Sequence, residues 1–244
     1  MPETPSLAQL RERLDQVEGV VLFTGAGMSA DSGIPTYRGA GGLWRGVRAE
    51  SLAHPLAFRA DPQLVTDWYR ERRRQMAAAP IHAGHRAAAA FCRRRPNRVV
   101  VTQNVDGFHQ RAGCPEVLEL HGSVWVERCT HCGEETPLDR EGPLAEEGEE
   151  VPLCSCGGHL RPGVVWFSEG LPAETLGAAG RLIRRAGALI VVGTSGVVEP
   201  AASLVRLAPP GMLLVEVNPA PAIEGAIQLP GTAADLLPRL LGAE

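Results

Sequence analysis

The sequence lacks long apolar runs and has no strong excess of either charge. It contains no run of about 18 apolar residues, the length that a membrane span requires. No apolar segment typical of a signal peptide lies near its start, so we expect a cytoplasmic protein that does not bind membranes. The formal net charge of only −4 gives no general electrostatic reason to expect direct nucleic-acid binding.

Cysteine is also scarce, with six residues among 244. In a reducing compartment such cysteines are more often thiols or metal ligands than disulfides. A chain of this length with 44% hydrophobic residues can build one large core and a smaller appended module. Arginines cluster at 70–74 and 93–95, and runs of this kind are usually solvated helix faces.

A glycine-rich segment follows the first strand-like run. Val20–Phe23 is a short apolar stretch typical of a buried parallel strand, and it leads into Gly25-Ala26-Gly27. Backbone without side chains can approach a phosphate closely, and a helix beginning near Ser29 would direct its N–H groups at the same anion. The alternative is an ordinary strand-to-helix turn. Gly33 and Pro35 require such a helix to end early, in a loop typical of a cofactor cover.

Polar residues follow two further strand-like runs. The run 98–102 leads into Gln103-Asn104-Val105-Asp106, and the run 117–120 leads into His121. The carboxyl ends of parallel strands meet at one edge of a sheet, so we expect these side chains beside the glycines. Histidine titrates in the range that suits a general base. The alternatives are an Asx-Gly turn and a structural or surface histidine.

Four cysteines occur as two close pairs. Cys129 and Cys132 are separated from Cys154 and Cys156 by 21 residues, which predicts a tetrahedral zinc site. The C-x-C pair is tighter than the usual spacing, so His131 and His159 stay alternatives for the fourth ligand. A site with four thiolates has no open coordination position and is structural. We expect Cys92 and Cys114 to pack rather than react.

The C-terminal half alternates helix and strand patterns, with helices expected at 173–185, 200–207 and 233–241. We therefore predict an α/β fold: a doubly wound, Rossmann-like parallel sheet of about six strands with a smaller helical and zinc-binding insertion domain. The expected Rossmann-like domain comprises residues 1–37, 83–123 and 163–244. The helical insertion comprises 38–82, and the zinc-binding insertion comprises 124–162.

In their order, these motifs resemble those of the sirtuins, the NAD-dependent protein deacylases. The pattern GAGxSxxSGIPxFR matches from Gly25 onward, with Tyr37 in place of phenylalanine, and TQNxD matches at 102–106. The pattern VVxFGE matches at 164–169, with Ser168 in place of glycine. The resemblance extends to Ala233 and implies NAD as co-substrate, one structural zinc ion and acyl-lysine-bearing proteins or peptides as partners. We expect a monomer.

The resemblance also implies roles for individual residues. It implies that His121 is the general base and that Asn104 and Asp106 position the nicotinamide and ribose. The residues implied in cofactor binding are Gly25, Ala26, Gly27, Ser29, Asp31, Ile34, Pro35, Tyr37, Arg38, Trp44, Gln103, Asn104, Val105, Asp106, Gly193, Thr194, Ser195, Asn218, Pro219, Ala220 and Ala233. Val165, Trp166 and Phe167 would form an exposed extended segment that pairs with a substrate peptide, and the alternative is an ordinary core strand.

Tyr69 and Arg72 refine the expected substrate. They are three residues apart in a predicted helix and so share a face, from which a phenol and a guanidinium would bind a carboxylate. The pair resembles the sirtuin subgroup that removes succinyl, malonyl or glutaryl groups, in which a small residue, here Ala53, widens the pocket. The alternatives are a solvated arginine-rich helix, a protein mono-ADP-ribosyltransferase, and a non-enzymatic zinc-ribbon binding module.

Overall fold

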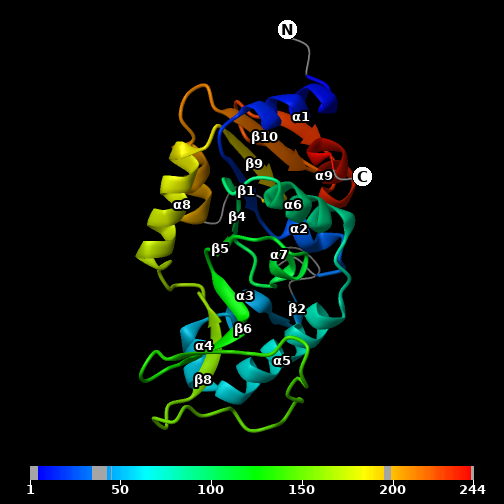
Figure 1. The fold of residues 1–244 in the computed structure, drawn as a ribbon. Helices are drawn as coiled ribbons and strands as arrows, with labels where there is room; N and C mark the ends of the chain where they lie inside the picture. The colour runs from blue at the N-terminus through cyan, green and yellow to red at the C-terminus, as the bar shows by residue number, and fades with distance from the viewer. Residues whose placement is uncertain (1–4, 35–42, 45, 195–198, 243–244) are drawn as a thin grey trace.

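The computed structural model describes residues 5–34, 43–44, 46–194 and 199–242. In this part of the chain, one large parallel sheet lies between two layers of helices, and a smaller antiparallel sheet packs with further helices at one end of it (Figure 1). None of the described helices combines the length and the apolar character that crossing a membrane demands. The predicted α/β class with a smaller zinc-binding part is confirmed.

The large sheet has six strands in the order β11-β10-β9-β1-β4-β5, all parallel. The strands are β1 (Val20–Thr24), β4 (Arg98–Thr102), β5 (Val117–Glu119), β9 (Ala188–Val192), β10 (Leu213–Asn218) and β11 (Ile227–Pro230). From β1 the chain adds β4 and β5 on one side, and from β9 it adds β10 and β11 on the other. The order therefore reverses between β1 and β9, which makes this the switch point where such sheets bind ligands.

Helices cover both faces of this sheet, which explains the uninterrupted apolar character of its central strands. Val20 and Leu22 join one core cluster, with α1 (Leu7–Gln16), α6 (Ala83–Arg93) and α9 (Ala233–Leu241). Val21 and Phe23 join a second cluster on the opposite face, with α8 (Ala173–Arg185) and η2 (Ala201–Leu207). The helix expected at 200–207 is thus a 3₁₀-helix rather than an α-helix.

The smaller part is built from helices and an antiparallel sheet of order β7-β6-β8. Its elements are β2 (Leu43–Trp44), β3 (Val47–Arg48), α3 (Ala49–Leu52), α4 (Pro55–Ala60), α5 (Pro62–Ala78), β6 (Gly122–Cys129), β7 (Glu135–Pro137) and β8 (Leu160–Val164). A third apolar cluster joins α5 to β6 and β8 through Trp68, Trp125 and Val164. In Figure 1 this part lies below the six-stranded sheet, and β6 and β8 extend toward that sheet.

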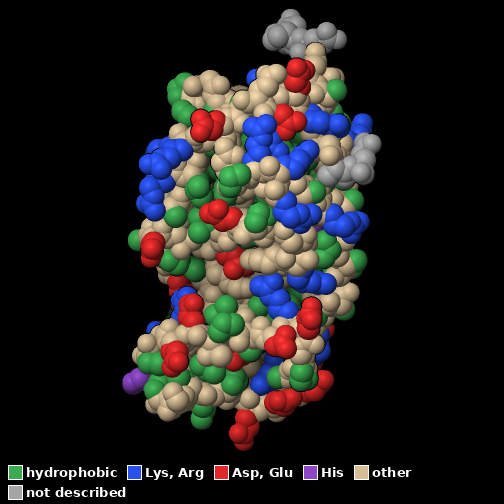
Figure 2. Space-filling model, viewed as in Figure 1, with side chains coloured by type: hydrophobic (Ala, Val, Ile, Leu, Met, Phe, Trp, Pro, Cys, Tyr) green, Lys and Arg blue, Asp and Glu red, His purple; other side chains and the backbone are tan. Residues whose placement is uncertain are grey.

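The two arginine clusters behave differently. Arg93–Arg95 are exposed as expected. In the 70–74 run, the alternative of a solvated helix face does not hold, because Arg70 and Arg73 are buried. Arg70 pairs with Asp67 at 2.9 Å, and Arg73 donates to the carbonyl of Val124 at 2.7 Å. On the face drawn in Figure 2, basic side chains are spread over the upper part and acidic ones gather toward the lower end.

Candidate active site

Three neighbouring strands bring the predicted site residues to one edge of the sheet. Thr24 ends β1 and lies in register with Thr102 of β4 and Val192 of β9. The loops that follow these strands are joined by backbone hydrogen bonds, from Gly25 N–H to the carbonyl of Val192 and from Gln103 N–H to the carbonyl of Thr24, each at 2.9 Å. The glycine-rich loop and the polar loop therefore lie side by side, as the sequence predicted.

The glycines of this edge allow two backbones to cross. A Cβ on Gly27 would lie 2.7 Å from Cα of Gly193, and Gly193 itself has a φ of +60°. The Gly27 N–H donates to the Gly193 carbonyl at 2.8 Å. These glycines were expected because backbone without side chains can approach a phosphate. The structure gives a second reason for them, which is the close packing of two loops. The helix that follows, α2 (Gly27–Ala30), has only four residues and ends before Gly33, as predicted.

Ser29, Asn104 and Asp106 form one buried hydrogen-bonded group. The Ser29 hydroxyl donates to Oδ2 of Asp106 at 2.7 Å, and Nδ2 of Asn104 donates to Oγ of Ser29 at 3.2 Å. The backbone N–H of Phe108, in α7 (Phe108–Arg111), donates to Oδ1 of Asp106 at 2.9 Å. Because both carboxylate oxygens accept hydrogen bonds, the orientation of Asp106 is fixed, and through Ser29 so is that of Asn104.

A second buried group supports the first and was missed by the sequence analysis. The Thr24 hydroxyl donates to Oγ1 of Thr102 at 2.8 Å and lies 3.0 Å from Nε2 of His109. The Asn104 backbone N–H donates to Oγ1 of Thr102 at 3.0 Å. Since the Thr24 proton is used on Thr102, His109 is the donor to Thr24. The available signal was a threonine at the end of each apolar strand, but its partners depend on the register between strands.

His121 lies where the large sheet passes into the small one. Its Nδ1 is 2.8 Å from the carbonyl of Gln103 and therefore carries the proton, which leaves the lone pair of the neutral ring on Nε2. Burial lowers the pKa of His121, although the bond to Gln103 opposes this. The His121 carbonyl accepts the N–H of Val165 at 2.8 Å, so the imidazole is held between the polar loop and the chain leaving β8.

The residues expected near the adenosine half of NAD also lie together. Nδ2 of Asn218 donates to the carbonyl of Thr194 at 2.8 Å, and Nε2 of Gln103 donates to its hydroxyl at 3.1 Å. Asp31 accepts the backbone N–H of Ala234 at 3.1 Å, next to Ala233 at the start of α9. Pro35, Tyr37, Arg38, Ser195 and the side chain of Trp44 lie outside the described residues. The remaining predicted cofactor residues lie in the same loops: Ala26, Ile34, Val105, Pro219 and Ala220.

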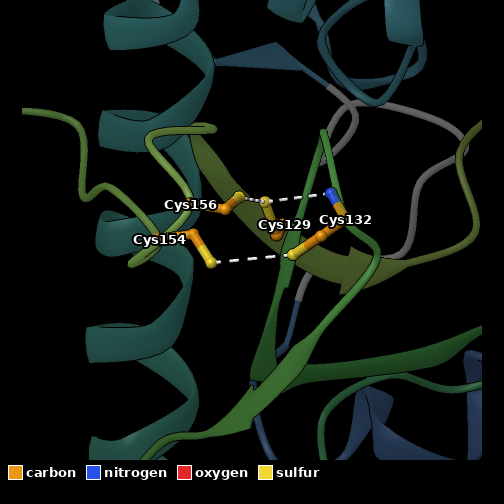
Figure 3. Close-up of side chains that lie close together, drawn as sticks. All are labelled: Cys129, Cys132, Cys154 and Cys156. Atoms are coloured by element: carbon orange, nitrogen blue, oxygen red, sulfur yellow. Dashed lines mark hydrogen bonds between the residues drawn. The ribbon is translucent and has the colours of Figure 1, made fainter.

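The four predicted zinc ligands converge at the end of the small sheet (Figure 3). Their sulfur atoms all lie within 4.8 Å of one another, with 3.4 Å between Cys129 and Cys156 and 3.7 Å between Cys132 and Cys154. A tetrahedral zinc ion with bonds of about 2.3 Å places its sulfurs about 3.8 Å apart, so the cluster fits zinc. Hydrogen bonds from the backbone of Cys132 and His131 lower the pKa of Cys129 to about 6, which favours the thiolate ligand.

The same cluster settles which residue completes the set. Among the described residues, it is Cys156 that joins the other three sulfurs, and neither His131 nor His159 belongs to the group. Since all four positions are filled by protein sulfur, a zinc ion here is structural.

Comparison with known protein families decides the identity of the chain. The family model described as the Sir2 family matches residues 25–200. The chain belongs to the Sir2 family.

The relatives of this Sir2 chain match its sequence along most of the length of both proteins. The protein of Aquifex aeolicus named NAD-dependent protein deacylase is 48% identical over 206 residues, which cover 82% of this chain and 83% of that one. The NAD-dependent protein deacylase 2 of Pyrobaculum aerophilum is 49% identical over 227 residues, covering 91% and 89%. A solved Sir2 homologue in complex with NAD superimposes with a TM-score of 0.87 at 40% identity, covering 96% of this chain and 92% of that one.

Most of the residues predicted to bind the substrate are buried in this Sir2 chain. Tyr69 and Arg72 lie on one face of α5, 1% and 8% exposed, with the Arg72 guanidinium 5.7 Å from the ring of Trp68. Ala53 is buried, and its carbonyl accepts the N–H of Phe167 at 2.9 Å. The expectation that 165–167 forms a fully exposed segment was wrong for Trp166. This side chain is 2% exposed, whereas Phe167 is 45% exposed.

Proposed function

We propose that this Sir2 protein removes acyl groups from lysine side chains of proteins with consumption of NAD. The acyl groups are succinyl and malonyl, and also acetyl. The products are nicotinamide, O-acyl-ADP-ribose and free lysine. Family membership and the names of the relatives support NAD-dependent deacylation. The choice of acyl group rests on one observation, the burial of Tyr69 and Arg72 on a common face of α5.

We assign the catalytic roles to the edge of the large sheet, between β1 and β9. NAD supplies C1′ of its nicotinamide ribose as the electrophile that the acyl oxygen attacks. Asn104 and Asp106, oriented through Ser29, position the nicotinamide and ribose. His121, neutral with its lone pair on Nε2, accepts the proton of a ribose hydroxyl and so makes that oxygen nucleophilic. Residues 38–82 and 124–162 form the proposed small domain opposite this edge.

The proposed acyl pocket is chemically suited to a carboxylate. A guanidinium is always charged and offers paired N–H donors that match the two oxygens of a carboxylate. Arg72 is 8% exposed, so such a contact would be poorly screened by water. Ala53 and Phe167 are joined by a backbone hydrogen bond, which links the small side chain of Ala53 to the proposed peptide segment. An acetyl group carries no charge and therefore forms no ion pair with Arg72.

The decisive experiment replaces Arg72 by methionine. We expect Arg72→Met to lower kcat/KM for a succinyl-lysine peptide about 100-fold, the value of a charge-assisted contact of about 3 kcal/mol, while kcat/KM for the acetyl peptide changes less than about threefold. Arg74→Met is the matched control, because Arg74 lies on the same helix but pairs with Glu71 at the surface. An equal loss on both peptides would refute the role of Arg72 in carboxylate binding.

The same assays separate the alternative activities. Mono-ADP-ribosyl transfer would leave ADP-ribose attached to protein, which intact-mass spectrometry detects. A binding module would release no nicotinamide from NAD. The sequence contains no lysine, so every deacylated lysine in the assay comes from the substrate rather than from the enzyme.

A further inference from the structure

We propose that Trp166 is a positioning residue that determines selectivity for acidic acyl groups by orienting the Tyr69 hydroxyl, and that Arg161 and Glu169 hold Trp166 in place. The inference rests on the proposed deacylase function and deepens it. It concerns a side chain first expected to face the substrate peptide, which instead points into the protein.

The contact between the two aromatic residues is direct. Nε1 of Trp166 donates a hydrogen bond of 2.9 Å to the hydroxyl oxygen of Tyr69, and both side chains are buried. An indole N–H can only donate, so the Tyr69 oxygen is the acceptor in this bond. The Tyr69 proton therefore points away from Trp166. A carboxylate oxygen of an acidic acyl group is an acceptor that suits a phenol held in this orientation, and the methyl group of an acetyl substrate has no such acceptor.

A partly buried ion pair between Arg161 and Glu169 fixes the indole that sets this orientation. The guanidinium of Arg161 lies 3.8 Å from the centre of the Trp166 ring. The same guanidinium binds both carboxylate oxygens of Glu169, at 2.7 and 2.8 Å. Partial burial would raise the pKa of Glu169, but the hydrogen bonds from Arg161 and from the Trp166 backbone outweigh it and lower the pKa. Glu169 is therefore ionised, and a bidentate pair of this kind has a narrow range of geometries.

Two hydrogen bonds between Trp166 and Glu169 also stabilise a tight backbone turn. Glu169 accepts the Trp166 N–H at 2.8 Å and returns its own N–H to the Trp166 carbonyl at 3.0 Å. Ser168, the third residue of this turn, has a φ of +72°, the conformation that a type II turn requires at that position. The turn, the ion pair and the stacked guanidinium leave the indole little freedom, so its N–H is held toward Tyr69.

The test measures selectivity rather than total activity. We expect Trp166→Phe and Tyr69→Phe each to raise KM for the succinyl-lysine peptide about tenfold, the value of one hydrogen bond to a charged group, with kcat changed less than about twofold. Kinetics on the acetyl-lysine peptide should fall less than kinetics on the succinyl-lysine peptide, and far-UV circular dichroism reports that each variant folds. The double variant should lose no more than the worse single variant, because both substitutions remove the same hydrogen-bonded unit.

The outcomes distinguish this inference from the function on which it rests. If the unsubstituted protein removes succinyl groups but Trp166→Phe lowers activity on both peptides equally, Trp166 is merely structural and the inference is wrong. Additive effects of the two substitutions would overturn it too. If the unsubstituted protein removes acetyl groups but no succinyl groups, the proposed acyl preference fails, and the inference fails with it.

Discussion

Individual site residues could be predicted from the sequence where they follow a recognisable strand. Asn104, Asp106 and Gly25 were placed correctly at one edge, because residues after parallel strands must meet there. The partners of these side chains could not be predicted. The hydrogen bond from His109 to Thr24 joins residues 85 positions apart, and the bond from Trp166 to Tyr69 joins residues 97 apart. Neither contact leaves a periodic signal in the sequence.

His85 leads to a prediction at the residue scale. It is fully buried, its two ring nitrogens have no hydrogen-bond partner in the part of the chain described, and burial lowers its pKa to about 2. The unfolded residue titrates near 6.5, so below that pH the unfolded state binds a proton that the folded state does not. Stability therefore falls as the pH drops below 6.5, by about 2 kcal/mol between pH 7 and pH 5 from this residue.

We expect His85→Leu to remove this share of the pH dependence. The measurement is the free energy of unfolding from urea titrations at pH 5 and pH 7. The control is His131→Leu, which removes an exposed histidine and should leave the difference between the two pH values unchanged. An unaltered difference in the His85 variant would mean that His85 is protonated in the folded state, contrary to the burial argument.

Elements were predictable in type where periodicity and length agreed. The helix 173–185 and the helix 233–241 have the predicted bounds, since both carry a long apolar face. The segment 201–207 is a 3₁₀-helix, and its apolar pattern did not distinguish this winding from an α-helix. Trp166 differs from the prediction because its ring is buried against the guanidinium of Arg161, a contact that no local pattern predicts. The need for glycine at position 193 could not be predicted either, because the backbone that approaches it belongs to the loop after β1.

Gly193→Ala tests the crossing of the loops after β1 and β9. The new Cβ would lie 2.4 Å from the carbonyl carbon of Gly27, in a residue whose φ is +60°. We expect a loss of at least about 3 kcal/mol in unfolding free energy, combining left-handed strain with displaced backbone. Weaker NAD binding by calorimetry should accompany it. The control Gly211→Ala also has a positive φ, +84°, but meets no atom within 4 Å, and should cost only about 1 kcal/mol.

If the two alanine variants lose equal stability, strain alone accounts for the cost. The close approach of the two loops would then have no energetic consequence.

At the scale of the whole molecule, the alternation of strands and helices was enough to predict a doubly wound sheet with an insertion, because parallel strands need covering crossovers on both faces. The expected domain bounds at 123, 124, 162 and 163 remain a prediction, and β6 and β8 reach slightly past them, to Gly122 and Val164. The absence of lysine also has a consequence at this scale. The printed sequence contains arginine but no lysine, so its side chains offer no acyl-lysine.

The zinc cluster should control catalysis through the shared strands β6 and β8. His121 directly precedes β6, and its carbonyl accepts the N–H of Val165, directly after β8. Loss of zinc would release the far ends of these strands and loosen the imidazole, while the six-stranded sheet keeps its own core. We expect a chelator to lower nicotinamide release at least about tenfold with little change in far-UV circular dichroism, and added zinc to restore it.

Two variants separate loss of zinc from other effects of the chelator. Cys156→Ser should lower the zinc content measured by mass spectrometry and reproduce the loss of nicotinamide release. His131→Ala, beside the cluster but outside it, should keep one zinc ion per chain and full activity. Because β6 and β8 pair at the cysteine end and again beside His121, with an irregularity between Ser123 and Glu127, the two strands connect the cysteines to His121. Full activity of the metal-free protein would show that the imidazole is held by the polar loop alone, through the bond to Gln103.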